Sequence, residues 1–246
     1  RVMREHAIKI KPRVDGILVD TCGTGGDKIK TFNISTVAMF VAAGAGVLIA
    51  KHGNRSVTSR SGSADLLEAV GVRIDLNPKE VQHVIEKIGI GFMFAPNFHI
   101  AMRHVASIRK EIGTRTIFNM LGPLSNPADA HAHVVGVYDL SLTEKFADVR
   151  GELGCERAMV VYGIDGLDEI STLGKTQVSE LFDGEIRTYT LHPSDFGIRT
   201  AKPEEIAGGD PNQNALILLN VLKGLNGPHR DIVLLNAAAA ILVSGK

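Results

Sequence analysis

The feature that most constrains the fold is a glycine-rich turn that follows a short apolar run near the start of the chain. Ile17-Leu18-Val19 has the length and the β-branched content of a buried strand, and the turn Gly23-Thr24-Gly25-Gly26-Asp27 comes soon after it. Glycines lack a Cβ atom, so they adopt positive φ angles easily and can turn successive N–H groups toward one anion. A plain strand–turn–helix unit without a ligand has the same pattern, so the turn alone leaves both interpretations open.

A second anion-binding feature follows shortly afterwards. Asn33, Ser35 and Thr36 come just before the apolar run 37–50, which has the character of a helix followed by a buried strand. We expect their side-chain oxygens to cap the helix and its free N–H groups to face an anion. Two features that suit phosphate oxygens therefore lie close together in the sequence.

Strand-like and helix-like segments alternate along most of the 246 residues, of which 44% are hydrophobic. This alternation predicts an α/β protein with a large, mostly parallel sheet and helices on both of its faces. The strands are expected at 17–19, 47–50, 72–74, 91–95, 132–138 and 158–162, with an antiparallel pair at 176–181 and 185–191. The helices are expected at 1–11, 37–46, 64–70, 78–88, 99–112, 115–121, 143–153, 212–223 and 231–243.

The composition restricts the possible partners. Lysine and arginine number 27, and aspartate and glutamate also number 27, so no net charge attracts nucleic acid or an anionic membrane. No apolar run approaches the roughly 20 residues that a membrane span needs. Cys22 and Cys155 are far apart and form no disulfide framework, which fits a reducing cytosol. Because the chain begins without Met and ends on Gly245-Lys246, we expect a fragment of a longer protein.

Charged side chains follow two other predicted strands. Lys51 and Arg55 come after the strand at 47–50, and the acid pair Asp168-Glu169 comes after the strand at 158–162. Open α/β sheets bind ligands at the carboxyl ends of their strands. The cations suit phosphate groups, and the acid pair suits Mg²⁺, together with a hydroxyl such as that of Ser35. The acid pair alone also fits a solvated loop, but the three loops together favour a phosphorylated, metal-bound ligand.

In their order and spacing, the motifs at 23–27, 33–36, 51–55 and 168–169 resemble the signature set of the anthranilate phosphoribosyltransferases. The resemblance covers nearly the whole chain, including 61–65, 118–124 and 236–239. It implies a glycosyltransferase-class enzyme, a pentosyltransferase of tryptophan biosynthesis. The reaction it implies joins anthranilate to phosphoribosyl pyrophosphate and gives N-(5-phosphoribosyl)anthranilate and pyrophosphate.

The resemblance also implies a fold of the nucleoside phosphorylase/phosphoribosyltransferase type. Residues 1–14 and 97–126 would form a small helical domain, incomplete in this chain. Residues 15–96 and 127–246 would form the large α/β domain that binds phosphoribosyl pyrophosphate, with the active site between the two. A cytoplasmic homodimer is implied for the full-length protein, acting on two small molecules without a nucleic acid or membrane partner.

By the same resemblance, individual residues are assigned to three sites. The expected phosphoribosyl pyrophosphate site comprises Gly23, Gly26, Asp27, Thr31, Asn33, Ser35, Thr36, Lys51, Ser59 and Ser63. The expected Mg²⁺ ligands are Ser35, Asp168 and Glu169, and the expected anthranilate contacts are Gly23, Asn54 and Arg109. The guanidinium of Arg109 suits a carboxylate, although its position also fits a surface arginine on an amphipathic helix. No general base is assigned, because Lys51 and Mg²⁺ can stabilise the leaving pyrophosphate electrostatically.

Two alternative functions share this fold. A pyrimidine nucleoside phosphorylase has a glycine loop but uses free phosphate and a nucleoside, and the motif 51–55 and the acid pair argue against it. A nucleic-acid-binding relative that is no longer an enzyme should have degraded motifs and a basic face. The intact motifs and the net charge of zero argue against that alternative.

Overall fold

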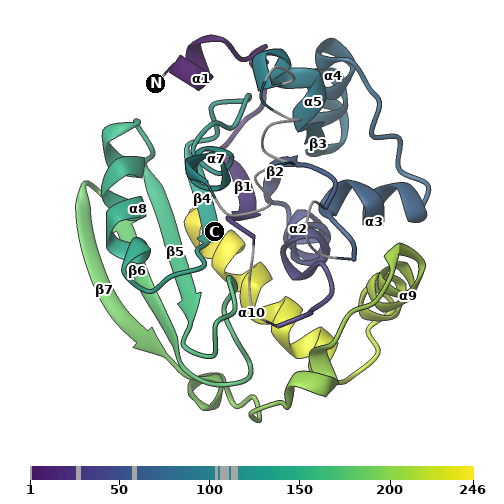
Figure 1. Cartoon of the computed structure of the whole chain (residues 1–246), viewed down its shortest axis with the longest axis vertical. Helices are drawn as coiled ribbons and strands as arrows, with labels where there is room; N and C mark the ends of the chain where they lie inside the picture. The colour runs from purple at the N-terminus through teal and green to yellow at the C-terminus, as the bar shows by residue number, and fades with distance from the viewer. Residues whose placement is uncertain (1, 26–28, 57–59, 103–104, 106–110, 112–115) are drawn as a thin grey trace.

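The computed structural model describes residues 2–25, 29–56, 60–102, 105, 111 and 116–246 of the chain (Figure 1). A seven-stranded sheet in the order β3-β2-β1-β4-β5-β6-β7 lies at its centre. The strands are β1 (Leu18–Gly23), β2 (Leu48–Gly53), β3 (Ile90–Phe94), β4 (Ala132–Gly136), β5 (Arg157–Gly163), β6 (Thr176–Phe182) and β7 (Glu185–Leu191). The helices are α1 (Val2–Glu5), α2 (Ile34–Gly44), α3 (Ser63–Ala69), α4 (Pro78–Ile88), α5 (Ala95–Phe98), α7 (Ile117–Leu121), α8 (Leu142–Glu152), α9 (Pro211–Leu222) and α10 (Pro228–Val243), with short 3₁₀ helices η1 (Ile100–Met102), η2 (Pro193–Phe196) and η3 (Pro203–Ile206).

The sheet is mostly parallel, as the sequence predicts. Strands β3, β2, β1, β4 and β5 pair in parallel, while β6 and β7 pair antiparallel with β5 and with each other. Val19 on β1 stands opposite Ile49 on β2 and Ala132 on β4, all three of them buried. Short runs rich in β-branched residues suit such central strands, because both faces of a parallel sheet are covered.

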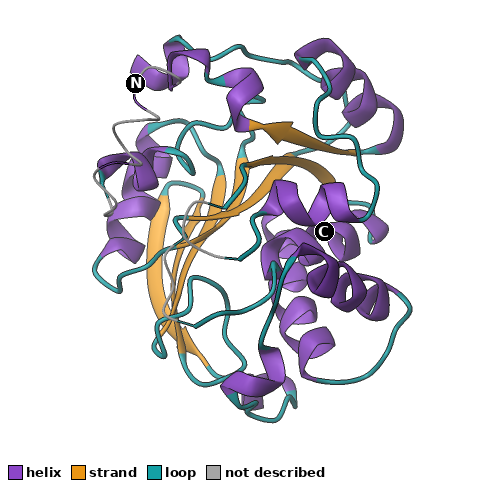
Figure 2. Cartoon of the chain, turned by 45° about the vertical axis from the view of Figure 1, so that its right-hand side comes forward, coloured by secondary structure: helices purple, strands orange, loops and turns teal. Residues whose placement is uncertain are grey.

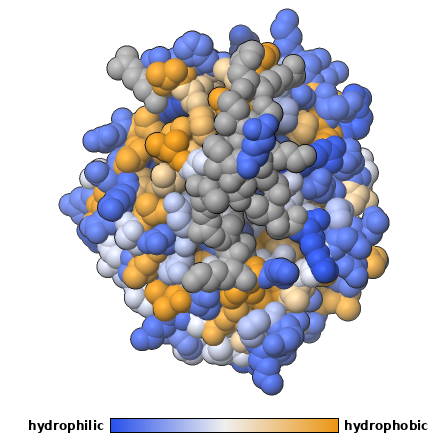
Figure 3. Space-filling model, viewed as in Figure 1, coloured by the Kyte–Doolittle hydropathy of each residue, from blue (hydrophilic) through white to orange (hydrophobic). Residues whose placement is uncertain are grey.

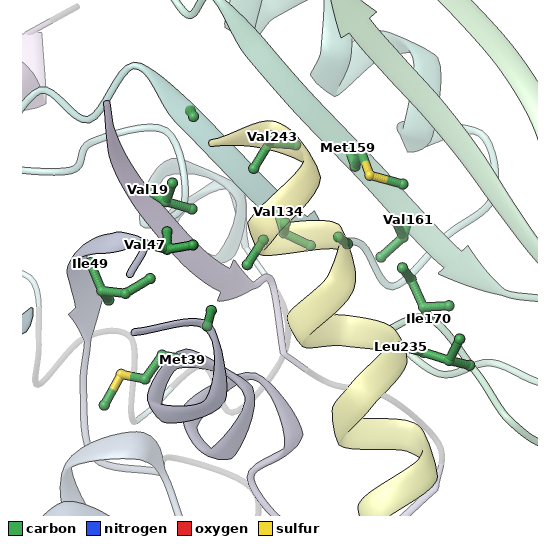
Figure 4. Packing of buried hydrophobic residues seen from close by; sticks show 14 of the residues in the cluster. Val19, Met39, Val47, Ile49, Val134, Met159, Val161, Ile170, Leu235 and Val243 are labelled. Carbon is green, nitrogen blue, oxygen red and sulfur yellow. The ribbon is translucent and has the colours of Figure 1, made fainter. Parts of the chain in front are cut away.

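Helices cover both faces of the sheet (Figure 2). On one face, Val19, Val134 and Val161 pack against α2 and α10, and Figure 4 shows Leu235 and Val243 of α10 in this core. On the other face, Val135 packs with Phe146 of α8, because neighbouring residues of a strand point to opposite sides. A further cluster on residues 10–14, α4 and α5 packs against β2 and β3. The predicted α/β architecture with helices on both faces is confirmed.

Three local predictions are wrong. The predicted helix at 1–11 ends at Glu5, because the Ile8 and Ile10 N–H groups instead donate to the carbonyls of Phe98 and Pro127. The predicted strand at 72–74 is an irregular connection in which Ile74 is buried in the core and the exposed Arg73 pairs with Asp75. The helix expected to begin at 37 begins at Ile34, since the Asn33 carbonyl already accepts from the N–H of Val37.

The remaining predicted helices lie within a few residues of their expected positions. Most of the helix expected at 99–112 falls outside the described residues, and residues 100–102 at its start form the 3₁₀ helix η1. Both cysteines are free thiols, as predicted. Within the described part of the chain, none of the helices has the length and apolar character needed to cross a membrane. On the face shown in Figure 3, hydrophilic residues dominate the rim and hydrophobic patches lie between them.

Candidate active site

The candidate site lies at the carboxyl ends of the parallel strands, where four of them end in glycine. β1 ends at Gly23, β2 at Gly53, β4 at Gly136 and β5 at Gly163. The loop that carries the acid pair crosses two of these ends. A Cβ atom on Gly23 would lie 2.5 Å from Oδ2 of Asp168, and one on Gly136 would collide with the Asp168 backbone. Glycine is therefore required here for close approach of the two chain segments.

The acid pair accepts hydrogen bonds from both predicted anion-binding features. Oδ2 of Asp168 accepts from the N–H of Gly25 at 2.9 Å, and Gly25 has the positive φ of 66° that the glycine turn predicts. Oε1 of Glu169 accepts from the N–H of Ser35 at 3.0 Å, in the first turn of α2. In this structure these two N–H groups thus bind carboxylate oxygens of the protein itself. Gly26 and Asp27 lie outside the described residues.

The predicted capping of α2 by side chains is wrong in detail. Asn33 is the N-cap residue but makes no side-chain cap hydrogen bond, and Ser35 and Thr36 lie inside the helix. The Asn33 amide instead donates to the carbonyl of Ser61 at 2.9 Å, and its Oδ1 accepts from the Ser61 hydroxyl and from Asn214 Nδ2, each at 3.0 Å. Asn33 therefore connects the start of α2 with the segment before α3 and with α9.

Lys51 is the buried cation of the site. Its ammonium donates to the carbonyl of Thr21 on β1 and to the hydroxyl of Ser35 at 3.3 Å. The positive charge of Lys51 therefore lies beside Ser35, within the candidate site.

Asp20 is a fully buried carboxylate on the neighbouring strand β1. It accepts hydrogen bonds from the N–H of His52 at 3.1 Å and from Asn126 Nδ2 at 2.8 Å. Burial raises the pKa of Asp20, and the positive charge of Lys51 offsets part of that rise.

The other predicted binding residues line the same edge or support it. Ser63 begins α3 and donates to the carbonyl of Asn54 at 3.2 Å, and the exposed Asn54 is at the end of β2. Thr31 forms an isolated bridge with Ala207, and Thr36 is buried. Ser59 and Arg109 lie outside the described residues. Of the predicted residues in the described ranges, a chain of contacts links Lys51 to Ser35, Ser35 to Glu169, and Asp168 to Gly23 and Gly25.

Arg55 does not supply the free cation that the sequence analysis expects. Its guanidinium pairs with Asp65 at 2.9 Å and with Glu68 at 2.8 Å, both on α3. Hydrogen bonds from Arg55 to Glu68 and then to Asp65 raise the pKa of the guanidinium. Arg55 therefore connects the end of β2 to α3, and Lys51 is the cation that lies next to Ser35.

Two buried histidines, His52 on β2 and His99 just after α5, pack against each other. The rings of His52 and His99 have their centroids 4.9 Å apart, and Nε2 of each has no hydrogen-bond partner among the described residues. Burial, and then the neighbouring His99, lower the pKa of His52 to about 3. His52 is therefore a neutral imidazole at neutral pH.

The donor set fits a hard cation better than a transition metal. Within the described ranges, no group of three or more histidine, cysteine, aspartate or glutamate side chains could hold a metal ion. Asp168, Glu169 and the hydroxyl of Ser35 provide oxygen ligands only. Mg²⁺ commonly binds one or two carboxylates and completes its shell with water and substrate phosphates, so this set fits Mg²⁺.

Four supporting residues are missing from the sequence analysis as site residues: Asp20, Asn126, Asn214 and Asn236. Each is a buried polar residue. Asn236 lies in the apolar helix α10, and its Oδ1 accepts from the N–H of Ile170, next to the acid pair, at 2.9 Å. For Asp20 and Asn236, a polar residue within an apolar segment is the sequence signal that could have identified them, because such groups are buried only when they are hydrogen-bonded. Asn126 and Asn214 lie among other polar residues and carry no such signal.

Comparison with known proteins agrees with this site. The family model described as "Glycosyl transferase family, a/b domain" matches residues 15–246. Anthranilate phosphoribosyltransferase of Methanocorpusculum labreanum is 59% identical over 240 residues, which cover 98% of this chain and 70% of that protein. The enzyme of the same name from Methanosarcina acetivorans is 57% identical, over 100% of this chain and 66% of that protein.

Solved structures agree as well. The crystal structure of the Thermus thermophilus anthranilate phosphoribosyltransferase has a TM-score of 0.92 and 45% identity, covering 99% of this chain and 72% of that one. The Saccharomyces cerevisiae enzyme in complex with PRPP and Mg has a TM-score of 0.89 and 34% identity, covering 99% of this chain and 68% of that one. The chain thus spans about two thirds to three quarters of the relatives that it matches. On this similarity in sequence and structure, the chain belongs to the anthranilate phosphoribosyltransferase family.

Proposed function

We propose that this protein transfers the phosphoribosyl group of phosphoribosyl pyrophosphate to the amine of anthranilate, with release of pyrophosphate. The observation that carries the proposal is the meeting of two anion-binding N–H groups with the acid pair, at Gly25 with Asp168 and at Ser35 with Glu169. A pyrophosphate ester bound with Mg²⁺ requires both kinds of group in one place.

When substrate binds, the N–H groups of Gly25 and Ser35 would exchange their carboxylate partners for phosphate oxygens, which leaves the carboxylates to the metal. Asp168, Glu169 and the hydroxyl of Ser35 would hold Mg²⁺, which, when bound, neutralises charge on the leaving pyrophosphate. Lys51 adds a fixed positive charge beside Ser35. Because these charges and dipoles are held in place before the reaction, they stabilise the developing negative charge without reorganisation.

The chemistry requires no nucleophilic side chain. Loss of pyrophosphate leaves positive charge on the anomeric carbon of the ribose. The aryl amine of anthranilate, neutral at pH 7, attacks that carbon, and the proton that its nitrogen then loses passes to the leaving pyrophosphate or to water. Cys22 is buried, and burial raises the pKa of its thiol, so the thiol is protonated at neutral pH. The neutral His52 near the end of β2 likewise adds no positive charge to the site.

The proposal also assigns individual residues to each of the two substrates. Phosphoribosyl pyrophosphate would contact Gly23, Gly26, Asp27, Thr31, Asn33, Ser35, Thr36, Lys51, Ser59 and Ser63. Anthranilate would contact Gly23, Asn54 and Arg109, with the guanidinium of Arg109 on the carboxylate. The similarity of this chain to the S. cerevisiae enzyme, solved in complex with PRPP and Mg, supports these assignments.

The assignment of residues 1–14 and 97–126 to one small helical domain is also proposed. A hydrogen bond of 2.8 Å from the Ile8 N–H to the Phe98 carbonyl, which joins the two segments, supports it. For the full-length protein we propose a cytoplasmic homodimer, by analogy with the family.

Depletion of anthranilate fluorescence on mixing with phosphoribosyl pyrophosphate and Mg²⁺ tests the reaction directly. We expect depletion only when all three are present together with the protein. Fluorescence that stays constant with both this chain and a full-length relative would refute the assignment of anthranilate as the acceptor.

A further inference from the structure

Asn236 on α10 forms a two-point contact with the loop that carries the acid pair. Its Oδ1 accepts from the N–H of Ile170 and its Nδ2 donates to the carbonyl of Ile170, each at 2.9 Å. Nδ2 also donates to the carbonyl of Ile232, one turn earlier on α10, at 2.9 Å. Only 2% of Asn236 is exposed. One side chain therefore satisfies both backbone groups of a single loop residue.

Ile170 directly follows Glu169. Hydrogen bonds that hold the Ile170 backbone in place therefore also restrict the backbone of Glu169. The Ile170 side chain is buried in the same core cluster as Leu235, and Figure 4 shows the two close together beside α10. Residues 164–175 lie in no helix or strand. Backbone hydrogen bonds hold the ends of this loop, for example from the Ile164 N–H to the Lys175 carbonyl, and Asn236 holds its middle at Ile170.

On its other side, the same loop reaches the edge of the sheet where the substrate is proposed to bind. The carboxylates of Asp168 and Glu169 reach the N–H groups of Gly25 and Ser35. α10 packs against α2, the helix that supplies the Ser35 N–H group. A polar residue within an apolar helix is costly unless it is fully hydrogen-bonded, and all three bonds of Asn236 are made inside the protein.

We propose that Asn236 is a positioning residue that sets the acid pair for binding Mg²⁺ together with phosphoribosyl pyrophosphate. This inference rests on the proposed function of the acid pair. It assigns to α10 a role beyond core packing: Asn236 determines where the carboxylates of Asp168 and Glu169 stand relative to the glycine turn. Residues that orient metal ligands typically change metal affinity by about 10- to 100-fold when they are removed.

The test compares Asn236→Ala with Val243→Ala, a control on the same helix. Val243 is buried in the core but lies two turns from the loop contact (Figure 4). Binding of phosphoribosyl pyrophosphate is measured by calorimetry at a series of Mg²⁺ concentrations, beside the melting temperature of each variant. We expect Asn236→Ala to raise the half-saturating Mg²⁺ concentration by about tenfold. Val243→Ala should lower the melting temperature and leave the Mg²⁺ dependence within about twofold of the wild type.

A second variant and a ligand-free measurement complete the test. Asn236→Ser loses the two-point contact, but a serine hydroxyl can still bond the carbonyl four residues earlier in a helix, so we expect it to fold if Asn236→Ala does not. Hydrogen exchange of the Ile170 amide should be faster in either Asn236 variant and unchanged in Val243→Ala. The proposal is overturned if both Asn236 variants keep the wild-type Mg²⁺ dependence, or if Val243→Ala shifts that dependence equally. Failure of the wild type to bind phosphoribosyl pyrophosphate would instead reject the proposed function, and the exchange of the Ile170 amide would then decide the positioning role alone.

Discussion

Replacement of Gly136 by alanine is the sharpest test of how closely the acid loop must approach the sheet. Gly136 is the last residue of β4, in register with Gly23 of β1 and Val161 of β5. Its carbonyl accepts from the N–H of Thr24 at 2.9 Å, so the strand end and the glycine turn are already joined. The backbone of Asp168 lies directly over the position that a Cβ atom of residue 136 would occupy.

The size of the effect follows from this geometry. An alanine Cβ would lie 3.1 Å from Cα of Asp168, and the carbonyl carbon and oxygen of Asp168 would lie closer still. Ordinary contact begins near 3.4 Å, so the Asp168 backbone must move by about 1 Å or more. A displacement of about 1 Å at a catalytic centre can cost about 100-fold in rate, which corresponds to about 2.7 kcal/mol of transition-state stabilisation.

The assay is the depletion of anthranilate fluorescence at saturating Mg²⁺, with the melting temperature measured beside it. We expect Gly136→Ala to lose about 100-fold in kcat/KM. Gly151→Ala is the matched control, because a Cβ there would meet Leu181 at an ordinary 3.6 Å and the residue lies within α8. That control should keep full activity and gain about 0.5–1 kcal/mol of stability. Activity of Gly136→Ala within threefold of the wild type would refute the argument that the two segments require glycine.

Three further predictions follow from the site. Because burial beside His99 lowers the pKa of His52 from 6.5 to about 3, the unfolded chain binds the proton first as pH falls through this range. The protein should therefore lose about 2 kcal/mol of stability between pH 7.5 and pH 5 from this group, and urea unfolding of His52→Gln should show a smaller loss. Glu169→Gln keeps an acceptor for the Ser35 N–H but removes the negative charge. The melting temperature should therefore stay constant, while the half-saturating Mg²⁺ concentration should rise about tenfold or more. An unchanged Mg²⁺ titration would show that Glu169 is not a metal ligand. Arg109→Ala should raise the KM for anthranilate far more than that for phosphoribosyl pyrophosphate, and equal changes would reject its assigned role.

Local patterns were sufficient to predict all seven strands of the sheet, although they also predicted a strand at 72–74 that is not there. The apolar runs that become β1, β2, β4 and β5 are short, and polar motifs follow each of β1, β2 and β5 in the sequence. Since parallel strands end at one edge, the positions of these motifs already indicated that Lys51, the glycine turn and the acid pair would lie at the same edge of the sheet.

Long-range pairing was not predictable in this way. Asp20 lies in an apolar strand, and its partner Asn126 is 106 residues away. Asn236 pairs with Ile170 across 66 residues, so neither contact leaves a local pattern. The wrong strand at 72–74 has the same cause. Its apolar residues correctly indicate that Ile74 is buried, but they do not show whether a neighbouring strand is there to pair with it.

Three of the four supporting residues are asparagines, and their contacts have one chemical feature in common. Asn126 binds Asp20 and the carbonyl of Ala50, Asn214 binds Asn33 and the N–H of Gly209, and Asn236 binds Ile170. Each side-chain amide offers two donors and an acceptor, so it can replace the backbone partner that a loop lacks. Besides the side chains of Lys51 and the acid pair, the proposed site uses backbone N–H groups, whose positions depend on the peptide planes and not on side-chain rotamers. Buried amides such as these therefore hold the peptide groups of the site in position, while the aliphatic core sets the stability of the sheet. Substitutions of the asparagines should mainly change the Mg²⁺ dependence, and substitutions in the aliphatic core should mainly change the melting temperature.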